Sequence, residues 1–127
     1  MYSIKTLPRD SIKHLMADAK KEGILFPKLD TKFICILNDD AEVVGFSGMR
    51  LLKSKAIMKN VYIDYHHRKQ GLASELILTR LTLLKGFGYK IIEANCTEMS
   101  LSIHLKHGAK IKETYKNGIT KVIYENL

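Results

Sequence analysis

Residues 61–84 constrain the fold more than any other stretch, because a strand pattern there runs into a helix pattern through a basic turn. Residues 61–63 are β-forming, and leucine, isoleucine and alanine recur at helical spacing from position 72 onward. The turn between them carries Arg68 and Gly71. A helix that begins after such a turn leaves its first backbone N–H groups unpaired at its positive end. The sequence therefore predicts a phosphate or pyrophosphate site at this turn.

The turn reads Arg-x-x-Gly-x-Ala, which resembles the acyl-CoA pyrophosphate motif of the GNAT superfamily of N-acyltransferases. It also lies where a member of that superfamily would have it, between a strand and an amphipathic helix near the middle of the chain. An ordinary turn with solvated basic side chains would account for the hexad alone, and the surrounding pattern favours the acyl-CoA interpretation. The six positions are Arg68, Lys69, Gln70, Gly71, Leu72 and Ala73.

Length and composition limit the classes of protein that this chain can belong to. With 127 residues it has room for one compact domain, which we expect to span residues 1–127. A content of 46% hydrophobic and 27% charged residues is typical of a folded protein. No apolar run reaches the roughly 20 residues of a membrane span, and Arg80 interrupts the most leucine-rich one. We therefore expect a cytoplasmic protein without a membrane partner.

Charge and cysteine content bear on the partners and cofactors. A formal net charge of +8, from 21 basic and 13 acidic residues, attracts polyanions such as CoA or nucleic acid. Cys35 and Cys96 lie inside apolar strand-like runs, so we expect buried, reduced thiols. No spacing of cysteine and histidine resembles a zinc site, and we expect no metal.

The remaining pattern predicts seven strands and three helices. A helix between the fourth and fifth strands makes a crossover, which implies a parallel pair inside a mostly antiparallel sheet. A turn at Asn117-Gly118 predicts that the last two strands form a hairpin. We expect strands at residues 2–7, 33–37, 42–52, 56–64, 90–96, 109–115 and 119–125, and helices from Asp10 or Ser11 to Gly23, at 69–84 and at 98–106, with a short connection at 24–31.

This order of elements is that of the GNAT fold. The resemblance implies a mixed α/β (α+β) fold with a mostly antiparallel sheet of six or seven strands and helices on both faces. It also implies that the fourth and fifth strands are parallel and splay apart, and that pantetheine lies in the opening like an extra strand. By motif position, its amides would bond the fourth-strand backbone at Val61 and Ile63, on either side of Tyr62.

The resemblance further implies that the pyrophosphate binds the N–H groups of residues 68–73. Gly71 would let the backbone approach closely, and the small Ala73 would keep the next turn clear. Arg68 and Lys69 would add positive charge. Two positions depart from the family pattern, because Tyr65 replaces a common proline and His67 a common aromatic residue.

The acid expected from the family pattern is a tyrosine that lies four residues before a glycine and protonates the departing CoA thiolate. Here the glycine is Gly108 and the tyrosine position is His104. Histidine could serve, since an ordinary pKa of about 6.5 leaves a protonated fraction at neutral pH. The alternative is a plain surface histidine, with the thiolate leaving unassisted or through water.

The general base is not selected by the sequence. An amine acceptor must lose a proton, and the nearest carboxylates along the chain are Asp64 and Glu93, with His66 as a third choice. Glu93 lies in the middle of the fifth strand, where we expect burial to raise its pKa toward a useful value.

The leading hypothesis is an acyl-CoA-dependent N-acyltransferase that uses acetyl-CoA, or another acyl-CoA, and a primary amine that attacks directly. The acceptor would be a small molecule, a peptide or a protein amine, and a homodimer is an open alternative. Lysines around the turn leave a second hypothesis, a GNAT-fold protein acting on nucleic acid or on an amine that nucleic acid carries. The missing tyrosine leaves a third, a non-catalytic acyl-CoA-binding domain.

Overall fold

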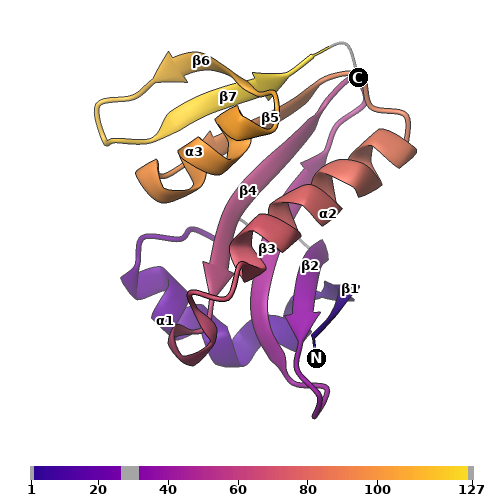
Figure 1. Cartoon of the computed structure of the whole chain (residues 1–127), viewed down its shortest axis with the longest axis vertical. Coiled ribbons are helices and arrows are strands. Elements are labelled where there is room, and N and C mark those ends of the chain that lie inside the picture. The colour runs from indigo at the N-terminus through magenta and orange to yellow at the C-terminus, as the bar shows by residue number, and fades with distance from the viewer. Residues whose placement is uncertain (1, 27–31, 126–127) are drawn as a thin grey trace.

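The computed structural model describes residues 2–26 and 32–125, and part of the connection expected at 24–31 lies outside them. The described strands form one sheet in the order β1-β2-β3-β4-β5-β7-β6 (Figure 1). The strands are β1 (Ser3–Pro8), β2 (Lys32–Leu37), β3 (Val43–Leu51), β4 (Ala56–Ile63), β5 (Ile92–Cys96), β6 (Lys110–Thr114) and β7 (Thr120–Tyr124). The helices are α1 (Lys13–Lys21), α2 (Leu72–Gly86) and α3 (Glu98–Lys106), with 3₁₀ turns η1 (Arg9–Ile12) and η2 (Tyr65–His67).

The predicted mixed sheet with a splayed parallel pair is confirmed. β4 and β5 are parallel, and every other pair of neighbouring strands is antiparallel. The parallel pairing ends at Met58 and Ala94, although β4 continues to Ile63 and β5 to Cys96. Just beyond Met58 the register against β3 shifts, so that β4 carries one extra residue. Such a bulge bends a strand, and here it coincides with the point where β4 leaves β5.

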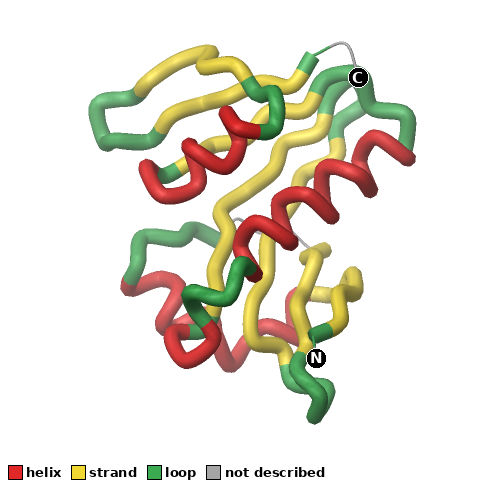
Figure 2. The backbone as a smooth tube through the Cα atoms, viewed as in Figure 1, coloured by secondary structure: helices red, strands yellow, loops and turns green. Residues whose placement is uncertain are grey.

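Helices cover both faces of the sheet, as the sequence predicts. α1 lies on one face, and α2 and α3 lie together on the other (Figures 1 and 2). In β2, Phe33 and Cys35 pack toward α1, whereas Ile34 and Ile36 pack toward α2. A strand buried on both faces reads as a continuous apolar run, which explains the pattern at residues 33–37.

The principal difference from the predicted boundaries is the start of the second helix, which begins at Leu72 instead of position 69. Lys69 and Gly71 have φ angles of 64° and 75°. Left-handed residues cannot continue a right-handed helix, so the turn extends to Gly71. Within the described residues, no helix has both the length and the apolar content needed to cross a membrane.

Candidate functional site

The backbone of β4 presents an unpaired edge where the two parallel strands separate. The N–H of Asp64 donates to the Val44 carbonyl of β3 at 2.7 Å. Alternate residues of an antiparallel strand direct their backbone groups to opposite sides, so Val61 and Ile63 direct theirs toward β5. Beyond Met58, no described strand pairs with this side of β4. The N–H groups of Val61 and Ile63 therefore face the splay.

The turn after β4 presents further unpaired N–H groups. The first hydrogen bond within α2 runs from the Glu75 N–H to the Gly71 carbonyl at 3.1 Å, and no side chain caps this helix end. The N–H groups of residues 72–74 consequently lack an intrahelical acceptor, and they lie at the positive end of a 15-residue helix. The left-handed conformation of Lys69, a strain that recurs at functional sites, shapes the same turn.

The side chain of Arg68 is directed toward α1. Its Nε donates to the Ile63 carbonyl at 2.8 Å, and its Nη2 donates to Glu22 at 2.6 Å. The guanidinium also lies over the ring of Tyr62, 5.4 Å from its centre. The hydrogen bond that Arg68 donates to Glu22 raises the pKa of Arg68. Through these contacts Arg68 links the end of β4 to α1. Because Glu22 neutralises much of the charge of Arg68, this arginine adds less positive charge to the turn than the sequence suggests.

Tyr62 packs against the aromatic cluster on the α1 face and is 3% exposed, and by the same alternation its backbone groups face β3, so Tyr62 is not part of the edge that faces the splay. Of the other predicted residues, Lys69, Gln70 and Gly71 are exposed, whereas Leu72 is buried in the core and the half-buried Ala73 packs against it.

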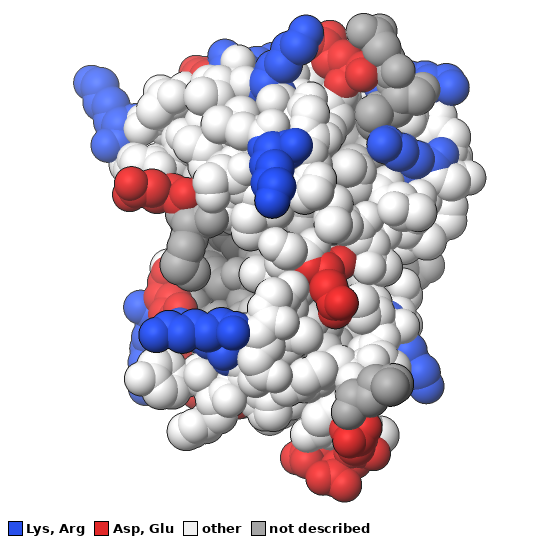
Figure 3. Space-filling model, viewed as in Figure 1, with Lys and Arg blue, Asp and Glu red and all other residues white. Residues whose placement is uncertain are grey.

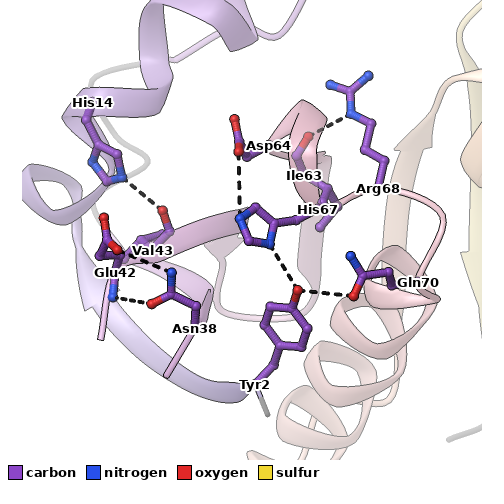
Figure 4. A network of polar contacts seen from close by, with 10 residues as sticks. All are labelled: Tyr2, His14, Asn38, Glu42, Val43, Ile63, Asp64, His67, Arg68 and Gln70. Carbon is purple, nitrogen blue, oxygen red and sulfur yellow. Dashed lines mark hydrogen bonds and ion pairs between the residues drawn. The ribbon is translucent and has the colours of Figure 1, made fainter. Parts of the chain in front are cut away.

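A polar network joins the start of the chain to this turn (Figure 4). The Tyr2 hydroxyl donates to Gln70 Oε1 at 3.1 Å and lies 2.9 Å from His67 Nδ1. Since the hydroxyl has one proton, this arrangement has His67 Nδ1–H donating to Tyr2. His67 Nε2 lies 4.0 Å from the carboxylate of Asp64, one of the predicted bases. Nothing in the sequence pattern pairs residue 2 with residues 67 and 70, because only the folded sheet brings them together.

The structure places Glu93 among lysines, and the expectation of a raised pKa is wrong. Its carboxylate is 3% exposed and lies 3.2 Å from Lys55 Nζ, 2.8 Å from Lys112 Nζ and 4.0 Å from Lys121 Nζ. Burial by itself would raise the pKa of Glu93, but hydrogen bonds from Lys112 and Lys55 bring it below its ordinary value. An ionised, lysine-paired carboxylate is a poor proton acceptor at neutral pH. Glu93 also pairs with Ile57, before the splay begins.

His104 lies in the core, and the expectation of a protonated fraction at neutral pH is wrong. The side chain is 2% exposed, and its Nδ1 lies 2.8 Å from the hydroxyl of Tyr124. Burial, with the charges of Arg80 and His107, lowers the pKa of His104 to about 4. Tyr124 pairs with Ile92 at the closed end of the β4–β5 pair. With its pKa lowered, the imidazole of His104 is neutral at pH 7 and is a poor proton donor to a departing thiolate.

This burial makes a prediction about stability against pH. The folded pKa of His104 is about 4, and the unfolded value is about 6.5. The contribution of the neutral His104 to the free energy of unfolding is therefore complete above pH 6.5. This contribution falls by about 3 kcal/mol as the pH drops toward 4. Urea unfolding between pH 7.5 and 4.5 measures it: His104→Asn should flatten this fall, whereas His107→Asn, at an exposed position, should keep it. Equal slopes in the two variants would refute the buried neutral histidine.

Arg80 is the residue of this region that sequence reasoning missed. It is completely buried on α2, and its Nη1 donates to the carbonyls of Gly48 at 3.1 Å and Lys59 at 2.8 Å. Its Nε and Nη2 have no partner among the described residues. Burial lowers the pKa of Arg80 to about 9, so it stays charged at neutral pH. Its spacing in the sequence indicates that it faces inward, because position 80 lies four residues from Leu76 and from Leu84, which both face the core.

Comparison with known proteins gives a family and a set of similar folds. The model of the acetyltransferase (GNAT) family matches residues 5–108. A Klebsiella pneumoniae subsp. pneumoniae MGH 78578 protein, named as a candidate acyl-CoA N-acyltransferase, is 19% identical, with a TM-score of 0.79 over 100% of this chain and 99% of that one.

Two structures similar to this one were solved with coenzyme A. PaiA N-acetyltransferase from Thermoplasma acidophilum, in complex with coenzyme A, is 14% identical with a TM-score of 0.76 and covers 98% of this chain and 99% of its own. N-acetylglutamate synthase from Neisseria gonorrhoeae, complexed with coenzyme A and N-acetyl-glutamate, is 13% identical with a TM-score of 0.78; the match covers 100% of this chain and 35% of that one. At these identities the likeness is one of fold. No curated protein matches the chain by sequence.

Proposed function

Because the family model matches residues 5–108, the chain belongs to the GNAT acetyltransferase family, and we propose that residues 1–127 act as one domain that transfers an acyl group from acyl-CoA to a primary amine. We propose acetyl as the acyl group and a small-molecule or peptide amine as the acceptor. No metal takes part in this proposal.

One observation carries it: the unpaired edge of β4 ends at an uncapped helix N-terminus. Val61 and Ile63 offer N–H groups to the amides of pantetheine, as an added strand would use them. The free N–H groups of residues 72–74 then lie where the diphosphate follows. The turn at residues 64–71 joins the two sets, so one extended ligand with an anionic group can use both.

In the proposed reaction, the amine attacks the thioester carbonyl directly, and the acyl–sulfur bond breaks. Asp64 and His66 stay proposed acceptors of the amine proton, but both follow Ile63, at the diphosphate end of the proposed pantetheine track, so they would act through water. Glu93 no longer belongs to this set, because lysines hold it ionised before the splay begins.

A panel of primary amines with acetyl-CoA tests the function. We expect thiol release that depends on the acceptor and saturates with acetyl-CoA. Absence of release across small amines, peptides and proteins, with CoA binding retained, would favour the non-catalytic acyl-CoA-binding domain. The neutral His104 is the observation behind that second candidate.

Nucleic acid is a less favoured partner in this proposal than a small-molecule or peptide amine. On the face that carries α2 and α3, basic side chains are interspersed with acidic ones and do not form a continuous patch (Figure 3). A nucleic-acid-binding protein should show an affinity for oligonucleotides that falls steeply with salt, whereas an enzyme that acts on a small amine should show little affinity for oligonucleotides.

A further inference from the structure

We propose that Arg80 is a further catalytic residue of this site, whose guanidinium stabilises the CoA thiolate as it leaves the acyl carbon. The proposal rests on the proposed function, because it requires the thioester to lie in the splay. It assigns to Arg80 the stabilisation of the thiolate, a task for which the neutral His104 is poorly suited.

Arg80 is located at the floor of the splay. Its Nη1 donates to the carbonyl of Lys59, the first residue of β4 beyond the last parallel pair, and to the carbonyl of Gly48 across the bulge. It also lies within electrostatic reach of β5. Burial raises the pKa of Cys96, the last residue of β5, to about 11, and the charge of Arg80 opposes that rise. The guanidinium thus lies at the bulge between β3 and β4, at the residue where β4 leaves β5.

The side chain has unused hydrogen-bonding capacity. Nε and Nη2 are buried and have no partner among the described residues. A buried cation without a counter-ion costs several kcal/mol, and nothing in the fold pairs these groups with a described carboxylate. Together Nε–H and Nη2–H form one edge of the planar guanidinium, which suits an anion held by two hydrogen bonds. An anion that arises beside this edge would satisfy both groups.

The thiolate is the anion that the reaction creates there. With the diphosphate at residues 72–74 and pantetheine along Val61 and Ile63, the thioester end points toward Lys59. The amine nitrogen bonds to the acyl carbon, and the carbon–sulfur bond breaks with its electron pair on sulfur. Arg80 keeps its proton and holds the thiolate through N–H···S hydrogen bonds. The proton that the amine loses goes to the base or to water.

Titration of wild-type protein with CoA and with desulfo-CoA, which lacks the thiol, tests this directly. A cysteine thiol has a pKa of about 8.5 in water, an alkyl thiol such as that of CoA has a somewhat higher one, and a neighbouring guanidinium would lower the pKa of the bound CoA thiol. CoA should therefore bind more tightly as the pH rises from 6 to 8, by about tenfold relative to desulfo-CoA, which is the worth of one charge-assisted hydrogen bond. An affinity ratio that does not change with pH would overturn the proposal.

Variants separate charge stabilisation from a structural role. In Arg80→Met the affinity ratio should become independent of pH, and kcat should fall about 100-fold with little change in KM for acetyl-CoA. Leu84→Met, one turn along the same buried face, is the control and should keep both properties. Arg80→Lys keeps the positive charge but lacks the edge with two donors. If Arg80→Met does not fold, the titrations of Arg80→Lys and of the wild-type protein together test the proposal. An Arg80→Met protein with the wild-type pH dependence would refute the role.

The outcomes also distinguish this proposal from the proposed function. If neither CoA nor desulfo-CoA binds the wild-type protein, both fail. If both ligands bind equally at every pH, the acyl-CoA site stands and only the role of Arg80 is lost.

Discussion

Gly71→Glu should weaken CoA binding at least about 100-fold and leave the protein folded. The φ angle of Gly71 is 75°, and a Cβ added there meets no atom within 4 Å. The cost to folding is therefore that of one left-handed residue, about 1–2 kcal/mol. The new carboxylate would lie beside the N–H groups proposed for the diphosphate. Two like charges about 4 Å apart near a protein surface repel by about 4 kcal/mol, which exceeds the roughly 2.7 kcal/mol of a 100-fold loss.

Gly88→Glu is the matched control for that variant. Gly88 also has a left-handed φ, 91°, and open space around it, but it follows the opposite end of α2. Calorimetry should show wild-type CoA affinity for Gly88→Glu, and urea unfolding should show a similar loss of stability in both. Equal CoA affinity in the two variants would contradict the assignment of the turn.

Phe46→Ala should lower the free energy of unfolding by about 3–5 kcal/mol. Phe46 is 1% exposed, and its ring centre lies 5.7 Å from that of Phe26, 5.8 Å from that of Phe33 and 5.6 Å from that of Tyr62. The alanine would leave a cavity behind β4, and the loss is a large part of the 5–15 kcal/mol that stabilises a typical domain.

Its control is Phe87→Ala, since Phe87 is 57% exposed and should change stability by no more than about 0.5 kcal/mol. Urea unfolding at pH 7.5 measures both variants. If Phe46→Ala and Phe87→Ala lose the same amount, the aromatic cluster does not support β4 as described.

The order and type of the elements could be predicted because each carries a local signal. The apolar run at 33–37 reflects a strand buried on both faces, and Asn117-Gly118 marks the last hairpin. The helix between β4 and β5 is enough to imply a parallel pair. The splay was different, because only the family resemblance implied it. It coincides with the bulge in β4, which no residue type announces.

The properties of the candidate catalytic side chains could not be predicted, because they depend on neighbours from distant parts of the chain. Glu93 is buried as expected, but hydrogen bonds from Lys112 and Lys55 reverse the direction of its pKa shift. His104 lies at the position of the family tyrosine, but it turns into the core and meets Tyr124. Arg80 looked like an interruption of an apolar run until the structure placed it beneath the splay.

Hydrogen exchange of backbone amides, with and without acetyl-CoA, tests the central claim most directly. If the ligand lies along the unpaired edge of β4 and ends at the N-terminus of α2, the amides of Val61, Ile63 and residues 72–74 should exchange more slowly in its presence, whereas Gly118 in the β6–β7 turn should not change. Unchanged exchange at Val61 and Ile63 in a saturated complex, or protection confined to α1, would contradict the account.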